Sequence, residues 1–377
     1  MAVTPQMSVH SLAPYRVKLS YLQETTSETN DEMRAVVFEA PGQVRVDERA
    51  LPTIQEPGDV VVRVTTGAIC GTDLHFYHGR VPLEQGAVVG HEFVGVVEEA
   101  GQTVQRFQPG DRVVGSFTSA CGMCWFCRRN LFNKCTGARI FGCGFAFGDL
   151  AGSQADFVLV PNADHNLLPV PEELSDEQAL FAGDIFTTGY YCAREGGVKP
   201  GDTVAVVGCG PVGIFAQMSA RVLGAAVVYG IDMVPARLKL AESIGSIPIN
   251  AADQDPLDVI LDATDWRGAD VTMECVGNEA ALETALRLVR PVGTVSVVGV
   301  FLEDRVGLPL GDLWIKNVTL KGGVCNVQRY WEETMSLIKS GRVDPTVIIS
   351  HTLPLEDAAH GYTLFDTREA TKVILKP

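Results

Sequence analysis

The fold is decided by the stretch TVAVVGCGPVGIFAQMSARVLGAAVVYGID, residues 203–232. An apolar run at 203–207 leads into a glycine-rich turn, GCGPVG, and a helix-like segment follows before a second apolar run ends at Asp232. This order predicts a strand, a tight turn, a helix and a second strand. Glycines at such a turn let the pyrophosphate of a dinucleotide approach the helix N-terminus, where free amides favour negative charge.

The acid that ends the second run indicates which dinucleotide binds. Asp232 follows Gly208 by 24 residues, near the spacing at which a carboxylate binds the adenosine ribose hydroxyls. Because a carboxylate repels a 2′-phosphate, it favours NAD over NADP. We interpret Arg237 as a solvated helix residue or an adenine-side contact. The predicted NAD-binding residues in this region are Gly208, Gly210, Pro211, Val212, Gly213, Asp232 and Arg237.

The alternation continues downstream and predicts a doubly wound parallel sheet. A helix-like segment at 235–245 precedes a loop, an apolar run at 269–277, an apolar-periodic segment at 279–290 and a further run at 293–300. Ligands in such sheets bind beyond the carboxyl ends of the strands. The residues expected beside the nicotinamide are therefore Cys275, Val276, Val298 and Gly299.

Four of the ten cysteines are clustered, as C-x2-C-x2-C-x7-C, in the segment CGMCWFCRRNLFNKC. Four thiolates in a turn-rich segment suit tetrahedral zinc, and disulfides are the competing reading. An iron–sulfur cluster usually has Pro after the last Cys, whereas Thr136 follows here. The pattern predicts a structural zinc held by Cys121, Cys124, Cys127 and Cys135.

A second, looser set of metal-binding residue types is spread over three segments. Cys70 lies in CGTDLH, His91 and Glu92 in VVGHEF, and Asp184 in FAGDIF. A thiolate, an imidazole and one or two carboxylates make an open zinc site with room for substrate. Each residue also has a simpler explanation, since Cys70 suits an apolar core, Glu92 a surface, and Asp184 the cap of a helix that begins near residue 185.

Composition excludes several classes of protein. The chain has 377 residues, 46% of them hydrophobic, and a net charge of −16. This length suits two domains with ordinary cores. The acidic balance argues against nucleic acid or anionic lipid as partners. Residues 1–32 lack the apolar core of a secretory signal, so we expect a disordered extension and a cytoplasmic protein.

Together, CGTDLH, GHE, the four-cysteine segment and VVGCGPVG with Asp232 resemble the zinc-dependent medium-chain alcohol dehydrogenases, from about residue 33 to the C-terminus. The resemblance implies an α/β chain with a GroES-like β-rich catalytic domain and a Rossmann domain. The expected boundaries are 33–186 with 325–377 for the catalytic domain, 119–137 for its structural zinc lobe, and 187–324 for the Rossmann domain. It also implies a homodimer or homotetramer.

Carried over by position, the resemblance makes Cys70, His91 and Asp184 the catalytic zinc ligands. Glu92 would be a second carboxylate that ligates directly or displaces the zinc water. The remaining roles fall to Thr72, which would touch the substrate oxygen, to His75, which would pass the proton to solvent, to Asp73, which would orient the zinc-bound histidine, and to Lys372, which would reach the cofactor pyrophosphate. His78 matches no role and is expected at the surface.

The implied function is hydride transfer between an alcohol and NAD, with two zinc ions per chain. Zinc lowers the pKa of a bound alcohol, and the proton leaves through Thr72, the ribose hydroxyl and His75. Polyol, threonine and formaldehyde dehydrogenases of the same family stay open, as does an NAD(H)-binding sensor without turnover. Aromatic residues expected near the substrate pocket are Phe76, Tyr77, Phe141 and Phe145.

Overall fold

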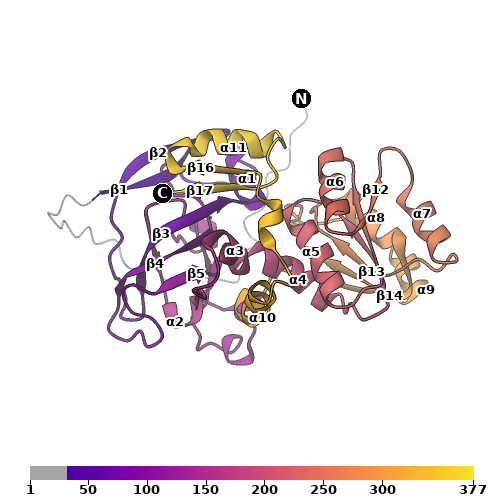
Figure 1. The fold of residues 1–377 in the computed structure, drawn as a ribbon, viewed down its shortest axis with the longest axis horizontal. Coiled ribbons are helices and arrows are strands. Elements are labelled where there is room, and N and C mark those ends of the chain that lie inside the picture. Colours follow the sequence, from indigo (N-terminus) through magenta and orange to yellow (C-terminus); the bar gives the residue numbers. More distant parts are fainter. Residues whose placement is uncertain (1–31) are drawn as a thin grey trace.

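The computed structural model describes residues 32–377 and shows a β-rich part beside an α/β part (Figure 1). The predicted disordered extension lies outside the described residues, apart from Glu32, which opens the first strand. Within residues 32–377 no helix is both long and apolar enough to cross a membrane.

The α/β part contains a six-stranded parallel sheet in the order β12-β11-β10-β13-β14-β15. Numbered from β10, this is the doubly wound order 3-2-1-4-5-6, with the change of direction between β10 and β13. Its strands are β10 (Thr203–Val207), β11 (Val227–Asp232), β12 (Ile247–Asn250), β13 (Ala269–Glu274), β14 (Val289–Val297) and β15 (Thr319–Gly322).

Helices cover this sheet, and strand β10 lies in its interior. All five residues of β10 are buried, as expected for a parallel strand with helices on both faces. Pro residues at the first helical turn start three of the helices, α5, α6 and α7. The helices of this region are α4 (Ile185–Glu195), α5 (Pro211–Val222), α6 (Pro235–Ser243), α7 (Pro256–Ala263), α8 (Glu279–Leu288), α9 (Leu310–Lys316) and α10 (Val327–Lys339).

The β-rich part is built on a seven-stranded sheet that joins the C-terminal strands to strands from the first half of the described chain. Its path is β16-β17-β3-β4-β5-β9, and β8 pairs with β3 off this path. The strands are β3 (Val60–Ile69), β4 (Glu92–Ala100), β5 (Arg112–Gly115), β8 (Phe157–Val160), β9 (Leu167–Pro169), β16 (His351–Pro354) and β17 (Val373–Lys376). The C-terminal strand β17 lies antiparallel beside β3.

Shorter elements complete this part of the chain. Two pairs of strands lie outside the main sheet, β1 (Glu32–Ala40) with β2 (Gln43–Ala50), and β6 (Thr118–Ser119) with β7 (Arg139–Ile140). The helices are α1 (Gly71–Tyr77), α2 (Ala163–Asn166), α3 (Asp176–Leu180) and α11 (Ala358–Asp366). Short 3₁₀ turns are η1 (Cys127–Arg129), η2 (Phe132–Lys134), η3 (Phe145–Phe147), η4 (Phe181–Gly183), η5 (Pro345–Ile348) and η6 (Leu355–Asp357).

The two parts share one apolar core. A single cluster joins Val94 and Val114 of the β-rich sheet to Phe186 of α4, Phe215 of α5 and Trp331 of α10. The Phe186 and Phe215 rings lie 5.4 Å apart. The predicted domain boundaries, just after the start of α4 and just before α10, are compatible with the two sheets and stay a prediction.

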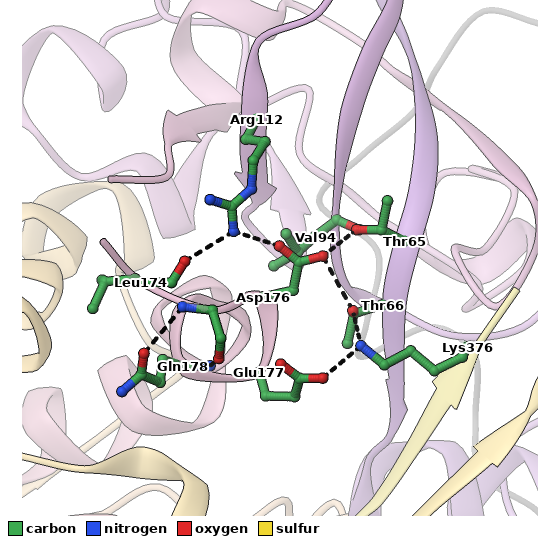
Figure 2. A network of polar contacts seen from close by, with 10 residues as sticks. Thr65, Thr66, Val94, Arg112, Leu174, Asp176, Glu177, Gln178 and Lys376 are labelled. Atoms are coloured by element: carbon green, nitrogen blue, oxygen red, sulfur yellow. Dashed lines mark hydrogen bonds and ion pairs between the residues drawn. The ribbon is translucent and has the colours of Figure 1, made fainter. Parts of the chain in front are cut away.

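A polar network joins α3 to strands β3, β5 and β17 of the β-rich sheet (Figure 2). Arg112 Nη2 donates to Asp176 Oδ1 over 2.6 Å, and Thr65 Oγ1 donates to Asp176 Oδ2 over 2.5 Å. Lys376 Nζ donates to Thr66 Oγ1 over 2.7 Å and to Glu177 Oε1 over 2.6 Å. Asp176 is therefore the centre of a contact between segments more than a hundred residues apart.

We expect Asp176→Asn to lower the free energy of unfolding by about 2 kcal/mol at neutral pH, because a charged hydrogen-bond acceptor is lost. Burial alone would raise the pKa of Asp176, but the hydrogen bonds from Thr65 and Arg112 outweigh it and hold the pKa below its ordinary value. The carboxylate therefore stabilises the fold above the unfolded pKa of about 3.9, and this stabilisation is lost as pH falls through the lower folded pKa.

Urea unfolding of both proteins, repeated from neutral pH downward, measures this. The difference in free energy of unfolding between wild type and Asp176→Asn should become smaller once the pH drops below about 4. Glu173→Gln is the matched control, because the Glu173–Lys339 pair is more than half exposed on both sides and such pairs contribute about 1 kcal/mol or less. If both substitutions lowered the free energy of unfolding equally, the proposed importance of the Asp176 network would be contradicted.

Candidate active site

The start of α1 presents three of the predicted site residues, Cys70, Thr72 and Asp73. Cys70 is the residue before the helix, and its backbone amide donates to Asp73 Oδ2 over 2.9 Å. Asp73 is the third residue of the helix, so its carboxylate reaches back in a capping box. The helix start thereby holds a thiol and a carboxylate at the carboxyl end of β3, and both residues are buried.

Three donor atoms from distant segments converge beside this turn. One atom each from Cys70, His91 and Asp184 lies within 4.8 Å of the other two, and all three residues are buried. The register of the sheet explains the meeting, because Glu92 pairs with Ala68 across β4 and β3, which places His91 beside the end of β3 and next to Cys70. Soft thiolate, imidazole and a carboxylate form a donor set that suits zinc.

The side chain of Asp184 faces this group and does not cap a helix. Asp184 precedes α4, but its side chain makes no capping hydrogen bond to the helix backbone. One carboxylate oxygen accepts from Thr188 Oγ1 over 3.1 Å, and the other lies 3.4 Å from His91 Nε2. Of the two readings that the sequence allowed, the geometry therefore favours the metal ligand.

The surroundings of His91 attract positive charge. Nδ1 lies 3.1 Å from Asp73 Oδ1, although the angle departs from that of a linear hydrogen bond. Burial alone would lower the pKa of His91, but the charges of Asp73 and Cys70 and the contact with Asp184 outweigh it and raise the pKa well above its ordinary value. A buried site that stabilises a cation in this way fits a divalent metal ion.

Glu92 and Lys372 form a buried ion pair. Lys372 Nζ donates to Glu92 Oε2, and both side chains are about 1% exposed. Burial alone would lower the pKa of Lys372, but the charge of Glu92 outweighs it and raises the pKa. Glu92 Oε1 has no hydrogen-bond partner. Glu92 is therefore beside the donor group rather than within it. The ammonium of Lys372, which was expected at the cofactor pyrophosphate, is directed at Glu92, because a buried charge needs a partner.

Thr72 and His75 lie on the partly exposed side of α1. Burial, and then the charges of Arg80 and His78, lower the pKa of His75 below its ordinary value. Its imidazole is therefore neutral near pH 7 and able to accept a proton. His75 Nδ1 is buried with no partner in the structure, which leaves a hydrogen-bonding position for a ligand. His78 lies half-buried with Nε2 2.8 Å from Asp366 Oδ1, an ion-pair partner that the sequence did not indicate.

The four clustered cysteines also converge. One sulfur atom from each of Cys121, Cys124, Cys127 and Cys135 lies within 4.8 Å of the others. The Cys124 and Cys127 sulfurs are 3.5 Å apart, near the roughly 3.8 Å expected for two thiolates on one tetrahedral zinc. All ten cysteines of the chain are free thiols in the structure, so the disulfide reading is not supported.

Backbone amides in this lobe point at sulfur. Cys121 N and Gly137 N donate to Cys135 Sγ over 3.2 and 3.3 Å. Hydrogen bonds from the backbone, first that of Cys127, lower the pKa of Cys124 to about 6, whereas burial raises the pKa of Cys127 and of Cys135. Such amides stabilise thiolates, which are the form that binds zinc. The lobe therefore fits the predicted structural zinc.

The glycine turn between β10 and α5 has the geometry that a dinucleotide needs. Gly208 has φ +95, and a Cβ on Gly213 would lie 1.8 Å from Gly208 O, so both positions require glycine. A Cβ on Gly210 would meet nothing within 4 Å, because this side of the turn is open. Pro211 and Val212 begin the twelve-residue α5, whose N-terminus is the expected pyrophosphate site.

Asp232 ends β11 and lies next to this turn. Its Oδ2 accepts from Cys209 N over 2.8 Å, and its Oδ1 accepts from Met233 N and Val234 N over 2.7 and 2.9 Å. Arg237 Nη1 lies 3.9 Å from Asp232 Oδ2, close enough to reduce its negative charge. The carboxylate therefore sits at the carboxyl edge of the sheet, as predicted.

The two segments that were expected beside the nicotinamide lie close together at the ends of β13 and β14. Glu274 accepts from Val276 N and Gly277 N with its side chain, and from Val298 N and Gly299 N with its carbonyl. A Cβ on Gly299 would lie 2.2 Å from Gly277 N. Cys275 continues from β13 with its amide bonded to Val207 O. One buried acid, which sequence reasoning missed, thus holds both segments.

The aromatic residues expected near the pocket separate into different environments. Phe141 is fully buried against Phe93 in the β-rich core, and Phe145 is 66% exposed. Phe76 packs edge-on against Phe147 and belongs to a cluster that also includes Leu302 of the α/β part. Phe141 is therefore a core residue and not a candidate for the pocket wall.

Known protein families match most of this chain. The profile of the alcohol dehydrogenase GroES-like domain matches residues 56–172, and that of the zinc-binding dehydrogenase domain matches residues 211–340. Zinc-type alcohol dehydrogenase B of Aspergillus flavus is 38% identical over 92% of this chain and 82% of its own. The solved structure of alcohol dehydrogenase TADH from Thermus sp. ATN1 is 47% identical, with a TM-score of 0.89 over 91% of this chain and 99% of its own.

Two further solved structures contain nicotinamide cofactors. A putative zinc-binding dehydrogenase from Sinorhizobium meliloti 1021, bound to NADP, has a TM-score of 0.82 at 27% identity and covers 92% of this chain and 100% of its own. An alcohol dehydrogenase from E. coli CFT073, complexed with NADH, has a TM-score of 0.82 at 26% identity and covers 92% and 99%. Both cofactors thus occur among chains of similar structure.

Proposed function

The chain belongs to the zinc-dependent alcohol dehydrogenases of the medium-chain dehydrogenase family, and we propose that Cys70, His91 and Asp184 hold its catalytic zinc. It is an oxidoreductase that transfers a hydride between an alcohol and a nicotinamide cofactor, giving an aldehyde or ketone. The convergence of these three buried donors from separate segments, next to a group of residues suited to proton transfer, is the observation that supports the assignment most directly.

The proposal includes a second zinc, held by Cys121, Cys124, Cys127 and Cys135. Every ligand of that site is a cysteine, so no position is open to substrate and its role is architectural. Two zinc ions per chain follow from these two groups of donors. Metal analysis of the purified protein measures this count directly.

The residues around the three proposed zinc ligands have different roles in the reaction. When bound, zinc polarises the alcohol oxygen and lowers its pKa, and nicotinamide accepts the hydride. Thr72 would take the alcohol proton at its hydroxyl oxygen and release its own hydroxyl proton toward the cofactor ribose hydroxyl. His75, neutral because burial lowers its pKa, would take up the relayed proton near the surface. Asp73 orients His91 from its Nδ1 side, while Nε2 faces Asp184.

The proposal also includes a preference for NAD over NADP. We expect Asp232→Gly to raise the NADP-to-NAD ratio of kcat/KM by about tenfold or more, equivalent to about 1.4 kcal/mol, since the charge that repels a 2′-phosphate is removed. Asp232 also accepts three backbone amides, so some loss with both cofactors accompanies the change. Asp232→Asn retains an acceptor oxygen and separates the charge effect from the loosening of the turn.

Initial rates with each cofactor at saturating alcohol give the ratio. The control is Asp258→Asn, which removes an exposed acid from α7 in the same part of the molecule and should leave the ratio unchanged. An unchanged ratio in both Asp232 variants would contradict the role of this carboxylate in cofactor choice.

Turnover itself is tested with zinc-replete protein and a panel of substrates. NADH formation is followed with primary, secondary and polyhydric alcohols, threonine and formaldehyde, each with NAD or NADP. Strong activity with one class identifies the substrate class and the cofactor together. Tight NADH binding without turnover across the whole panel would support the sensor reading over an enzyme of these classes.

A homodimer and a cytoplasmic location complete the proposal. The edge strand β15 is exposed along its length, and the adjacent α9 exposes three large apolar side chains, Leu310, Trp314 and Ile315. An exposed edge strand has unpaired backbone groups and readily pairs with another strand. A second copy of the chain, related by a two-fold axis, can bury β15 and the apolar side chains of α9. Light scattering gives the mass in solution. The free thiols fit a reducing compartment.

A further inference from the structure

A line of buried polar side chains leads from the C-terminal helix α11 to His91. Tyr362 OH donates to Gln154 Oε1 over 3.1 Å, and Gln154 Nε2 donates to Asp73 Oδ2 over 3.2 Å. Asp73 Oδ1 in turn lies 3.1 Å from His91 Nδ1. All four residues are 3% exposed or less. Segments more than two hundred residues apart are thereby joined through side chains alone.

The orientation of the Gln154 amide is determined by its neighbours. Its nitrogen donates to two acceptors, Ala68 O over 3.0 Å and Asp73 Oδ2. If the amide were flipped, its oxygen would face that carbonyl and that carboxylate, so two acceptor pairs would repel each other. The Tyr362 hydroxyl supplies the donor that the amide oxygen requires. Gln154 therefore has one favourable orientation, and Tyr362 stabilises it.

The carboxylate of Asp73 is in turn held on one side by this amide. Its Oδ2 accepts from both Cys70 N and Gln154 Nε2, which leaves Oδ1 for His91. A histidine whose Nδ1 faces a carboxylate presents Nε2 with its lone pair free. In this structure Nε2 lies 3.4 Å from Asp184 Oδ2.

The backbone holds Gln154 against the segment that carries His91. Gln154 N donates to Val89 O over 3.0 Å, and Ser153 N donates to Gly90 O over 2.9 Å. A Cβ on Gly90, which has φ +94, would lie 2.3 Å from Gln154 Cγ. The glutamine side chain thus passes directly over the residue that precedes His91, and only glycine leaves room for it.

We propose that Gln154 and Tyr362 are positioning residues of the catalytic metal site, which hold Asp73 so that His91 binds the metal through Nε2. The proposal rests on the proposed function, because it takes His91 as a ligand. Within residues 32–377 neither side chain is hydrogen-bonded to Cys70, His91 or Asp184, so we expect their effect on the metal to pass through Asp73. Residues in such outer positions commonly change metal affinity by about 10–100-fold when replaced.

The test uses Tyr362→Phe, which removes one hydroxyl and leaves the ring in place, and Gln154→Leu, which removes both polar groups. The matched control is Tyr330→Phe, because Tyr330 is equally buried and its hydroxyl donates to Glu195, away from the metal donors. Zinc affinity of the full-length protein is measured by competition with a chromogenic chelator. The catalytic ion is then exchanged for Co²⁺, and its absorption spectrum reports the ligand geometry.

We expect about tenfold weaker binding of one zinc ion in Tyr362→Phe and a larger loss in Gln154→Leu, with an altered Co²⁺ spectrum in both. Tyr330→Phe should match wild type in both readouts even where its stability falls. If the Tyr362 and Gln154 variants match Tyr330→Phe, the positioning role is overturned. If Cys70→Ala retains the full zinc content, the ligand assignment fails instead, so the two failures are distinguishable.

Discussion

Replacing Cys70 with alanine should reduce turnover by about a thousandfold or more while NADH still binds. The Cys70 thiolate is one of three protein donors at this site. A catalytic zinc ion needs three protein ligands, so His91 and Asp184 alone are too few to hold it. Loss of the metal removes several kcal/mol of stabilisation of the reacting oxygen, and each 1.4 kcal/mol corresponds to about tenfold in rate. The glycine turn that binds the cofactor is formed by other residues, 208–213, and remains intact.

Three measurements on Cys70→Ala check this expectation. Zinc content should fall by one ion per chain, kcat/KM should collapse, and the NADH dissociation constant measured by fluorescence should stay within a few-fold of wild type. Cys192→Ser serves as control, because Cys192 is a buried thiol beside Ser296 with no part in either donor group. Full zinc content together with ordinary turnover would show that another residue holds the catalytic ion.

Replacing Cys135 with serine should strongly destabilise the folded protein. Cys135 is fully buried, and its sulfur accepts two backbone amides. Loss of a structural metal belongs to the few changes that cost more than about 4 kcal/mol, which lowers the melting temperature by on the order of 10 °C. One zinc ion per chain should be lost.

The destabilisation caused by Cys135→Ser should extend beyond the four-cysteine lobe, because side chains connect the lobe to the segment between β15 and α10. Asn133 Nδ2 donates to Val324 O over 2.7 Å, and Asn326 Nδ2 donates to Asn130 O over 2.6 Å. Hydrogen exchange should therefore increase in residues 324–328 as well as in the lobe. The same Cys192→Ser control should keep both zinc ions and cost only about 1 kcal/mol. A Cys135→Ser protein with unchanged zinc content would refute the structural site.

Local patterns in the sequence predict much of the α/β part. The stretch 203–232 specifies β10, the glycine turn, α5 and β11 because the strand, turn and helix signals are adjacent. The short strands β12 and β15 were not expected, nor were α7 and α9. The segment that forms β12 and α7 was expected to be a loop, and α9 and β15 follow the last predicted run at 293–300. Four residues of mixed polarity, as in β12, carry too little periodicity for prediction, and the pairing of β12 with β11 supplies what its sequence does not.

The candidate site shows where prediction from sequence ends. By itself the sequence identified the chemical groups, because metal-binding spacing and a glycine fingerprint are encoded by neighbouring residues. The tertiary structure decided what each group faces. It directed Asp184 to His91 instead of a helix cap, and it buried Lys372 against Glu92 instead of leaving its charge at the cofactor edge.

Only the tertiary structure revealed Gln154 and Tyr362 as partners of Asp73. A glutamine and a tyrosine carry no spacing signal, and their distance along the chain exceeds two hundred residues. Hydrogen bonds reach about 3 Å and depend on orientation, so contacts between distant segments exist only once the sheet has set their register. The sequence determined which chemistry is available, and packing decided which groups meet to perform it.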